Sequence, residues 1–326
     1  MKLKLILAII ASVLAPFVSQ ALFAQQYPSK PIRLITPYPA GSGTDNFLRA
    51  LGVEFTKSWG QPVVVDNRPG ASTIIAAEAC AKAPADGYTL CMLDRGTLSF
   101  VPHLYRKLPF DPARDFEPIS YLNNLVSALA VSPGVPANSV KELVELARTK
   151  PGTLNYSSLG DGTPPHLVIE WIKKKFGVNL VHIPFKSPPM MIQTLVSGEV
   201  PVTYFGLINL LGPIRGGKAK ALAVSGDTRS PLLPDVPTLA EAGLQGLDGR
   251  VWFGLFAPAG TSKDIVDKVY REVARIFALP EFREQRLISQ GWEPVASTPE
   301  ELARFMKADR DVAAELVRIS GAKLLD

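Results

Sequence analysis

The sequence predicts an α/β protein of two domains, each built on a mostly parallel sheet with helices on both faces. Predicted strands and helices alternate almost throughout the chain, and this alternation is typical of parallel sheets. The length of 326 residues favours two domains, because a single core rarely grows beyond about 250–300 residues. The composition, 47% apolar and 20% charged, is that of a soluble globular protein.

Hydrophobic spacing and capping residues place the elements of the N-terminal part. Residues 32–35 form an apolar run, and Phe47, Leu51 and Phe55 recur four residues apart, as on the buried face of a helix. Ser72 stands where an N-cap is expected. We therefore predict strands 32–35, 63–65 and 88–93, helices 44–58 and 72–83, and a proline-rich loop over 102–118.

Capping signals also place the later helices. Ser139 with Glu142, and Thr298 with Glu301, have the spacing of capping boxes, and Gly321 is expected to end the last helix. The remaining elements are predicted as strands 127–131, 154–158, 180–183, 200–205, 221–224 and 250–257, and helices 139–149, 166–176, 262–278 and 299–320.

The first 24 residues are predicted to be a secretory signal peptide. Lys2 and Lys4 precede an apolar run over 5–18, which is shorter than the roughly 20 residues of a membrane span. Ala21 and Ala24 each end a segment suited to cleavage, and an uncleaved anchor is the alternative. We expect a soluble periplasmic protein.

Charge excludes one class of partner. The formal net charge of +5 falls to +3 once Lys2 and Lys4 leave with the signal peptide. This charge is too small and too evenly spread for a nucleic-acid-binding surface, but it suits a protein that meets small anions.

The cysteines and histidines of the sequence suggest at most one disulfide and no metal site. Cys80 and Cys91 follow each other across a predicted helix and strand, and in an oxidising compartment they either pair or remain two small buried residues. His103, His166 and His182 lie far apart in the sequence and show no metal-site spacing. We therefore predict no metal and no cofactor.

Two glycine-rich loops, 38–45 and 157–166, each follow a strand and open a helix. Helix N-termini present unpaired backbone N–H groups, so two such loops facing each other would hold an anion. Each loop alone is equally consistent with an ordinary strand-to-helix connection. A dinucleotide site is disfavoured because Asn46 replaces the third glycine of that fingerprint.

Catalytic motifs are not found, since the chain contains no Gly-x-Ser-x-Gly sequence. Arg95 follows Asp94 at the end of a predicted strand, where it would either clamp a ligand carboxylate or form a local ion pair. An exported enzyme acting on small carboxylates is the weaker alternative to a binding protein.

The chain resembles the periplasmic solute-binding proteins of tripartite tricarboxylate transporters, the Bug (Bordetella uptake gene) or TctC-like family. The resemblance covers essentially the whole mature chain. It is carried, in order, by segments 27–35, 37–45, 60–71, 86–90, 154–158, 182–186, 233–238 and 252–260. Any one of these segments is a weak signal, but the ordered set is specific.

The resemblance implies the fold of a two-lobed, type II-like periplasmic binding protein whose lobes close on a ligand. Lobe 1 would comprise 27–123 plus 251–326, and lobe 2 would comprise 124–250. Such proteins deliver small carboxylates to membrane transporter subunits, or report to a sensor protein, and do no chemistry on the ligand. We expect a monomer.

By this resemblance, the two loops hold the ligand from opposite lobes. Arg95, Phe205 and Gly206 are added as candidates because they depart from the residues that the family commonly has there. The candidate ligand-binding residues are Tyr38, Ala40, Gly41, Ser42, Gly43, Thr44, Asp45, Arg95, Ser158, Gly160, Asp161, Gly162, Thr163, Phe205 and Gly206.

Departures from the family pattern bear on the ligand. Asp161 stands where the family usually has asparagine, and Pro164 and Pro165 replace two serines. Phe205 and Gly206 replace a polar pair. We therefore expect one carboxylate at the first loop and a less polar, mono- or aromatic carboxylate body against Phe205, with Arg95 supplying charge.

Overall fold

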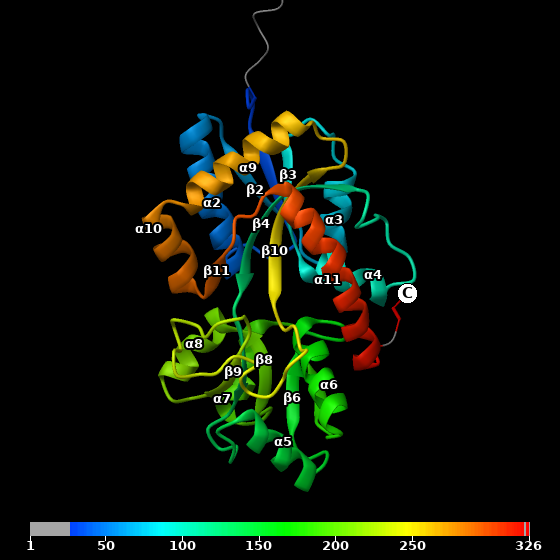
Figure 1. Cartoon of the computed structure of the whole chain (residues 1–326), viewed down its shortest axis with the longest axis vertical. Helices are drawn as coiled ribbons and strands as arrows, with labels where there is room; N and C mark the ends of the chain where they lie inside the picture. The colour runs from blue at the N-terminus through cyan, green and yellow to red at the C-terminus, as the bar shows by residue number, and fades with distance from the viewer. Residues whose placement is uncertain (1–26, 323, 326) are drawn as a thin grey trace, which may run out of the picture.

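The computed structural model describes residues 27–322 and 324–325, which form two lobes stacked along the long axis of the molecule (Figure 1). The predicted signal peptide lies outside the described residues. Lobe 1 holds a six-stranded sheet in the order β11 (Trp292–Pro294), β4 (Phe116–Leu125), β10 (Val251–Pro258), β3 (Thr89–Asp94), β1 (Ile32–Thr36) and β2 (Val63–Asn67). Lobe 2 holds a five-stranded sheet in the order β7 (Val181–Pro184), β6 (Asn155–Ser158), β8 (Val202–Gly206), β5 (Ser127–Val131) and β9 (Lys220–Val224).

Helices cover these sheets. In lobe 1 they are α2 (Gly43–Trp59), α3 (Ile74–Ala81), α4 (Val101–Leu104), α9 (Lys263–Phe277), α10 (Pro280–Phe282) and α11 (Pro299–Ser320), with the short turns η1 (Ala71–Thr73), η2 (Gly96–Phe100), η3 (Arg283–Leu287) and η4 (Ile288–Gln290). In lobe 2 they are α5 (Val140–Thr149), α6 (Pro164–Phe176), α7 (Pro188–Ser197) and α8 (Leu207–Arg215). The predicted α/β class and two-lobed architecture are confirmed.

Both sheets are mixed. β1 pairs in parallel with β2 and β3, and β6 pairs in parallel with β7 and β8, as the alternating pattern predicts. In contrast, β10 runs antiparallel to both its neighbours, and so does β5. The antiparallel strands β5 and β10 adjoin the points where the chain crosses between lobes. Strand β4 of lobe 1 leads directly into β5 of lobe 2, and β10 begins where the chain crosses back from lobe 2 into lobe 1.

Helix α11 belongs to both lobes. Leu302 and Met306 pack in the core of lobe 1, whereas Leu316 and Val317 join the core that contains α6 in lobe 2. Figure 1 shows the red end of α11 lying beside α6. Helix α11 therefore contributes to both lobes and connects them in addition to the two crossovers.

Some local predictions fail for physical reasons. Ser72 does not cap a helix, because Ala71, Ser72 and Thr73 all have positive φ and α3 begins only at Ile74. The capping box of Thr298 and Glu301 is complete. Strands β4 and β11 were not predicted, and β4 includes part of the segment expected to be a proline-rich loop.

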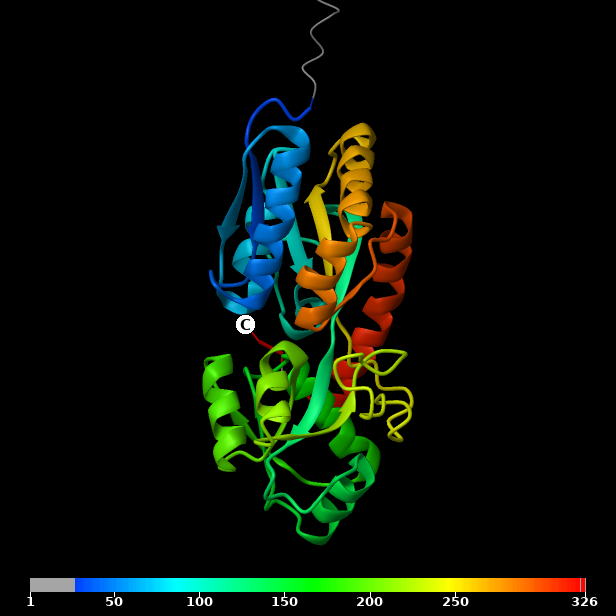
Figure 2. The same cartoon turned by 90° about the vertical axis from the view of Figure 1, so that its left-hand side faces the viewer.

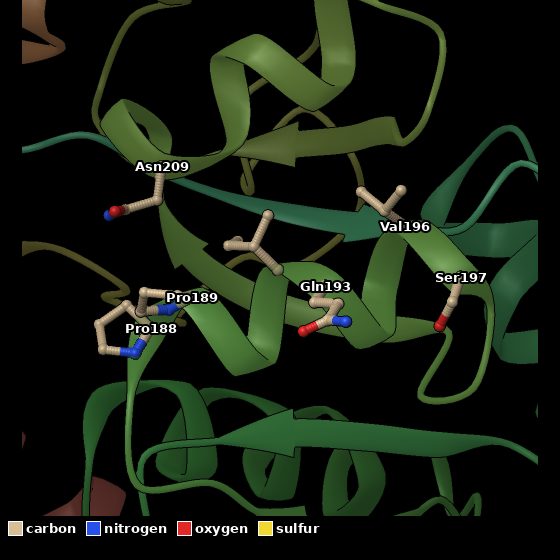
Figure 3. A pocket seen from close by; sticks show the side chains of 7 residues that line it. Pro188, Pro189, Gln193, Val196, Ser197 and Asn209 are labelled. Atoms are coloured by element: carbon tan, nitrogen blue, oxygen red, sulfur yellow. The ribbon is translucent and has the colours of Figure 1, made fainter.

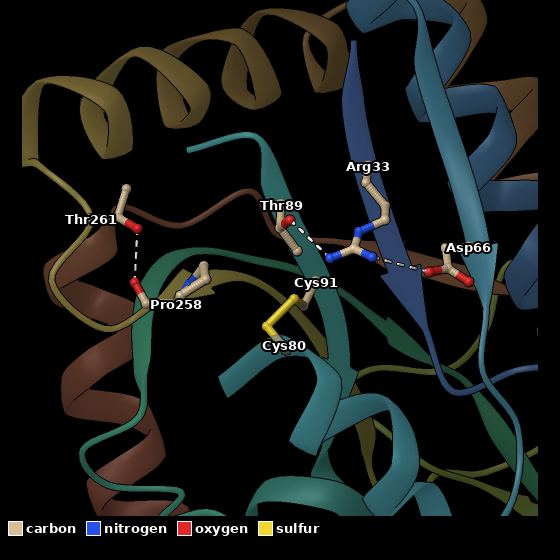
Figure 4. Close-up of a disulfide and its surroundings, with 7 residues drawn as sticks. All are labelled: Arg33, Asp66, Cys80, Thr89, Cys91, Pro258 and Thr261. Carbon is tan, nitrogen blue, oxygen red and sulfur yellow. Dashed lines mark hydrogen bonds and ion pairs between the residues drawn. A yellow bond between two sulfur atoms is a disulfide. The ribbon is translucent and has the colours of Figure 1, made fainter. Parts of the chain in front are cut away.

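Cys80 and Cys91 are joined by a disulfide between α3 and β3 (Figure 4). Both cysteines are fully buried, and the bridge closes a loop with a sequence separation of 11 residues. On the adjacent strands, Arg33 donates to Thr89 and lies 3.7 Å from the Asp66 carboxylate.

Reduction of this disulfide is expected to lower the free energy of unfolding by about 3 kcal/mol, since the bridge restricts the unfolded chain. Urea denaturation with and without reductant measures the effect. A double variant, Cys80→Ala with Cys91→Ala, is the control and should not respond to reductant. Equal unfolding midpoints for the oxidised and reduced wild-type protein would contradict the expectation.

Among the described residues, no helix combines the length and the apolar character needed to cross a bilayer.

Candidate functional site

The first glycine-rich loop is shaped by Asp45. This buried carboxylate accepts hydrogen bonds from the backbone N–H of Gly41 at 2.8 Å, from Arg49 at 2.9 Å and from Asn67 at 2.8 Å. Burial tends to raise the pKa of Asp45, but the hydrogen bonds from Arg49, Asn67 and Gly41 outweigh burial and hold the pKa below its ordinary value. Asp45 therefore holds the loop against the N-terminus of α2 through these hydrogen bonds.

Ser42 caps α2 and determines which backbone donors remain. Its Oγ accepts from the N–H of Asp45 at 3.2 Å. The first N–H groups of a helix have no intrahelical acceptor, so those of Gly43 and Thr44 stay at the N-terminus of α2. These two amides and the helix dipole are what this loop can offer an anion.

Tyr38 is held in place beside this loop. Its hydroxyl donates to the Asp94 carboxylate, and its ring packs on Phe253 with centroids 5.7 Å apart. Asp94 also accepts from the N–H and hydroxyl of Thr97 at 2.8 and 2.6 Å. Burial and the Asp94 carboxylate hold the pKa of Tyr38 well above its ordinary value. Ala40, between Tyr38 and the helix, is exposed.

In the second loop, most backbone N–H groups are hydrogen-bonded to acceptors of the same loop or of α6. The N–H of Gly160 donates to Ser158 Oγ at 2.9 Å, that of Gly162 to His166 Nδ1 at 3.1 Å, and that of Thr163 to the carbonyl of Gly160. Helix α6 then begins with Pro164 and Pro165, which have no N–H group. The prediction that this loop holds a carboxylate through several amides is therefore not supported by its hydrogen bonding.

Three polar side chains gather at the second loop instead. Asp161 Oδ1 lies 3.4 Å from His182 Nδ1 and 3.8 Å from His166 Nε2. The two imidazole rings are 4.6 Å apart, and Tyr156 stacks on His182. Burial lowers the pKa of both histidines below the ordinary value.

Sequence spacing failed to reveal this cluster. Residues 166 and 182 are separated along the chain, and we expected no metal-site geometry from them. They meet because β6 and β7 are parallel neighbours in which Tyr156 pairs with His182, while α6 starts just after β6. The usable signal was one histidine at the start of the helix that joins two predicted strands and a second histidine in the strand that follows it.

Each loop contacts the opposite lobe. A side chain at Gly43 would place its Cβ 2.7 Å from Ile208 Cδ1 of α8, so the N-terminus of α2 touches lobe 2 closely. At Gly162, where φ is +75°, a Cβ would lie 2.4 Å from Leu104 Cδ1 of α4. Figure 2 shows α2 on the same side of the molecule as α7 and α8. Neither Ile208 nor Leu104 was among the predicted site residues.

Arg95 has a different environment from the one predicted. Its guanidinium is 1% exposed and lies 2.7 Å from the Asp309 carboxylate of α11. It also donates to the carbonyls of Asp248 and Arg250 at 2.8 and 2.9 Å. These contacts anchor the second crossover to lobe 1 through Nη1 and Nη2, and Nε is buried without a hydrogen-bond partner. Because the whole side chain is buried, we do not retain Arg95 as a ligand clamp.

Phe205 and Gly206 end β8 near the first crossover. Phe205 is half-buried and packs on the core beneath α7 and α8, and a Cβ at Gly206 would lie 2.8 Å from Leu125. A pocket of 540 Å³ lies nearby between α7 and α8 (Figure 3). It is lined by Pro188, Pro189, Ile192, Gln193, Val196, Ser197 and Asn209, and by none of the predicted site residues.

Two lobes joined by two crossovers, with a helix N-terminus at the junction, define a two-lobed ligand-binding protein. The model of the tripartite tricarboxylate transporter family receptor, TctC, matches residues 47–321. The chain belongs to this family, which is a family of periplasmic solute-binding receptors and not of enzymes. The resemblance found in the sequence is thus confirmed.

Solved structures of similar chains agree with this assignment. The periplasmic binding protein BugD is 32% identical, with a TM-score of 0.80, and the match covers 92% of this chain and 100% of BugD. An R. palustris protein with adipate is 31% identical, with a TM-score of 0.83 and coverage of 92% and 100%. MatC from Rhodopseudomonas palustris with bound malate is 30% identical, with a TM-score of 0.78 and coverage of 89% and 100%.

Proposed function

We propose that the protein captures a small carboxylate between its lobes in the periplasm and delivers it to the membrane subunits of a tripartite tricarboxylate-type transporter. Export by a cleaved signal peptide belongs to this proposal. The observation that carries it is the N-terminus of α2, which begins at Gly43, where a Cβ would lie 2.7 Å from Ile208 Cδ1 of the opposite lobe.

The amides of Gly43 and Thr44 suit one carboxylate. A carboxylate at a helix N-terminus gains about 0.3–1 kcal/mol from the dipole when exposed, and more when partly buried. Asp45 cannot itself attract an anion, but its bonds to Gly41, Arg49 and Asn67 keep the loop in the shape that presents these amides.

The two ends of the site differ. The second loop has few free backbone amides, and it carries the negatively charged side chain of Asp161, which is 68% exposed. A ligand with a full carboxylate at both ends would therefore meet repulsion at the second loop. This asymmetry supports a mono- or aromatic carboxylate, whereas two similar chains have been solved with adipate and malate.

Calorimetry on protein stripped of ligand tests the proposal. We expect a monocarboxylate or aromatic carboxylate such as benzoate to bind more tightly than adipate, malate, citrate or aspartate. The first loop supplies the same amides to all of them, and Asp161 penalises those with a second carboxylate. A clear preference for citrate or aspartate would contradict the ligand class, and binding of no carboxylate would contradict the function.

A further inference from the structure

We propose that Asp161 and His182 form a binding site for a divalent transition-metal ion, in the class of Zn²⁺, at the second loop. The ion would take an oxygen donor of the bound solute in an open coordination position. Binding of the metal does not depend on the solute. The coordination of a solute oxygen by the metal rests on the proposed carboxylate-binding function.

The tautomer of His182 is linked to the hydroxyl of Ser158, which is the hydrogen-bond partner of Nε2. The hydroxyl of Ser158 donates to the Gly160 carbonyl at 3.1 Å and accepts from the Gly160 N–H at 2.9 Å. When the Ser158 proton goes to the Gly160 carbonyl, Ser158 Oγ accepts the 2.5 Å bond from His182 Nε2; the other tautomer of His182 reverses this bond. The metal-binding tautomer is the first one, in which Nε2 carries the proton and Nδ1 has a free lone pair.

That lone pair faces a second acceptor. Asp161 Oδ1 lies 3.4 Å from Nδ1, so in this tautomer two groups that both lack a proton lie side by side. A cation between them would resolve the repulsion. A metal bonded to both atoms at about 2.0–2.1 Å would make an angle of about 110° at this separation, which is the tetrahedral value.

The surroundings match those of known metal ligands. A ligating histidine usually donates its other ring N–H to a fixed acceptor, and Ser158 Oγ lies at 2.5 Å from His182 Nε2 to serve as one. His166 accepts at Nδ1 from Gly162, so its Nε2 carries a proton directed at Asp161 Oδ1, 3.8 Å away. In this arrangement His166 orients the carboxylate, and it is not itself a ligand.

The donor set selects the metal. One imidazole nitrogen and one carboxylate oxygen favour Zn²⁺, Ni²⁺ or Co²⁺, whereas Mg²⁺ and Ca²⁺ prefer oxygen donors alone. With two protein ligands, the remaining positions of a four-coordinate ion stay open. Because Asp161 is 68% exposed, these positions are accessible to water or to an oxygen atom of a solute.

The metal also resolves the charge problem at this loop. Arg95, the cation that the sequence analysis assigned to this role, is buried against Asp309 and the second crossover. A divalent ion beside Asp161 would reverse the sign of the local charge, so the repulsion of a second carboxylate by Asp161 applies to the metal-free protein. The second loop would then attract an electron-rich oxygen atom although it has few free amides.

The test uses chelator-treated protein and ZnCl₂ alone, followed by calorimetry at neutral pH without any carboxylate. We expect one Zn²⁺ per chain. Asp161→Asn should weaken binding by at least about tenfold, because it removes a charged ligand. Asp161 is exposed, so this variant should fold normally, and Asp235→Asn, which removes an exposed carboxylate elsewhere in lobe 2, should bind like the wild type.

Nitrogen-15 NMR of the histidine rings gives a second readout. Zn²⁺ should shift the signal of His182 Nδ1 in the wild type and leave it unchanged in Asp161→Asn. The proposal is overturned if Zn²⁺ does not bind, if Asp161→Asn binds as tightly as the wild type, or if His182 Nδ1 carries a proton at neutral pH.

Failure of this inference is distinguishable from failure of the proposed function. Repeating the carboxylate panel in chelator reports on the first loop without metal. Carboxylate binding without any Zn²⁺ binding would overturn only the metal site. Zn²⁺ binding without any carboxylate binding would support the site and contradict the function.

Discussion

Replacing Asp309 by leucine is expected to lower the free energy of unfolding by about 3–5 kcal/mol, because it leaves a buried guanidinium without its principal counter-charge. Asp309 Oδ1 lies 2.7 Å from Arg95 Nη2, and its Oδ2 accepts from the Trp252 indole N–H at 2.7 Å. All three side chains are buried. The substitution therefore also leaves the indole donor unpaired. Urea denaturation measures the loss.

A second variant separates lost charge pairing from lost packing. Arg95→Met combined with Asp309→Leu removes both charges, so it should recover part of the stability lost in Asp309→Leu alone, while the Trp252 indole and the carbonyls of Asp248 and Arg250 stay without these partners. Glu315→Leu removes an exposed acidic partner of Arg318 on the same helix and should change the unfolding midpoint little. A small effect of Asp309→Leu, or no recovery in the double variant, would contradict the role assigned to this pair.

The same pair explains how α11 influences both lobes. Asp309 lies between the part of α11 that packs on lobe 1 and the part that packs beside α6. Arg95 bridges Asp309 to the carbonyls of Asp248 and Arg250. The second crossover is thereby tied to the helix that spans the lobes, so damage at Asp309 is expected to affect their relative position as well as stability.

The sequence predicted the elements whose signals are local. The spacing of Phe47, Leu51 and Phe55 indicated α2, and all three are buried in one core. Thr298 and Glu301 form the capping box that their spacing indicates. Such features depend on residues within one or two turns of each other, and the folded environment does not override them.

Elements that depend on partners far along the chain were missed. Pro118, Asn123 and Asn124 interrupt the apolar pattern of β4, yet β4 is held between β10 and β11 in the sheet of lobe 1. Its pairing with segments more than a hundred residues away compensates for weak local propensity. No pattern within 116–125 reveals those partners.

The candidate site also has one part with local sequence signals and one part that depends on residues far apart in the chain. The first loop is local, since Ser42 and Asp45 shape it from within the strand–loop–helix junction, and it was predicted from the sequence. The cluster of His166, His182 and Asp161 depends on the pairing of β6 with β7. Arg95 was assigned to the ligand because its partner Asp309, more than two hundred residues later, gives no sequence signal.

Replacing Gly43 by leucine is expected to weaken binding of the tightest carboxylate by about 5- to 150-fold while the protein remains folded. Gly43 is at the first position of α2 and does not have a positive φ, so lobe 1 alone accommodates a side chain. Across the lobes, a Cβ there would lie only 2.7 Å from Ile208 Cδ1. Overpacking of about 1–3 kcal/mol would then oppose closure, and about 1.4 kcal/mol corresponds to tenfold in affinity.

A compensating variant identifies the clash. Ile208→Ala opens space opposite Gly43, so Gly43→Leu combined with Ile208→Ala should bind more tightly than Gly43→Leu alone, and calorimetry compares the two. Urea denaturation should show that Gly43→Leu unfolds like the wild type, since the strain arises only between lobes. Wild-type affinity in Gly43→Leu would mean that the solute binds without α2 approaching α8. In that case the amides of Gly43 and Thr44 would hold their anion from one lobe alone.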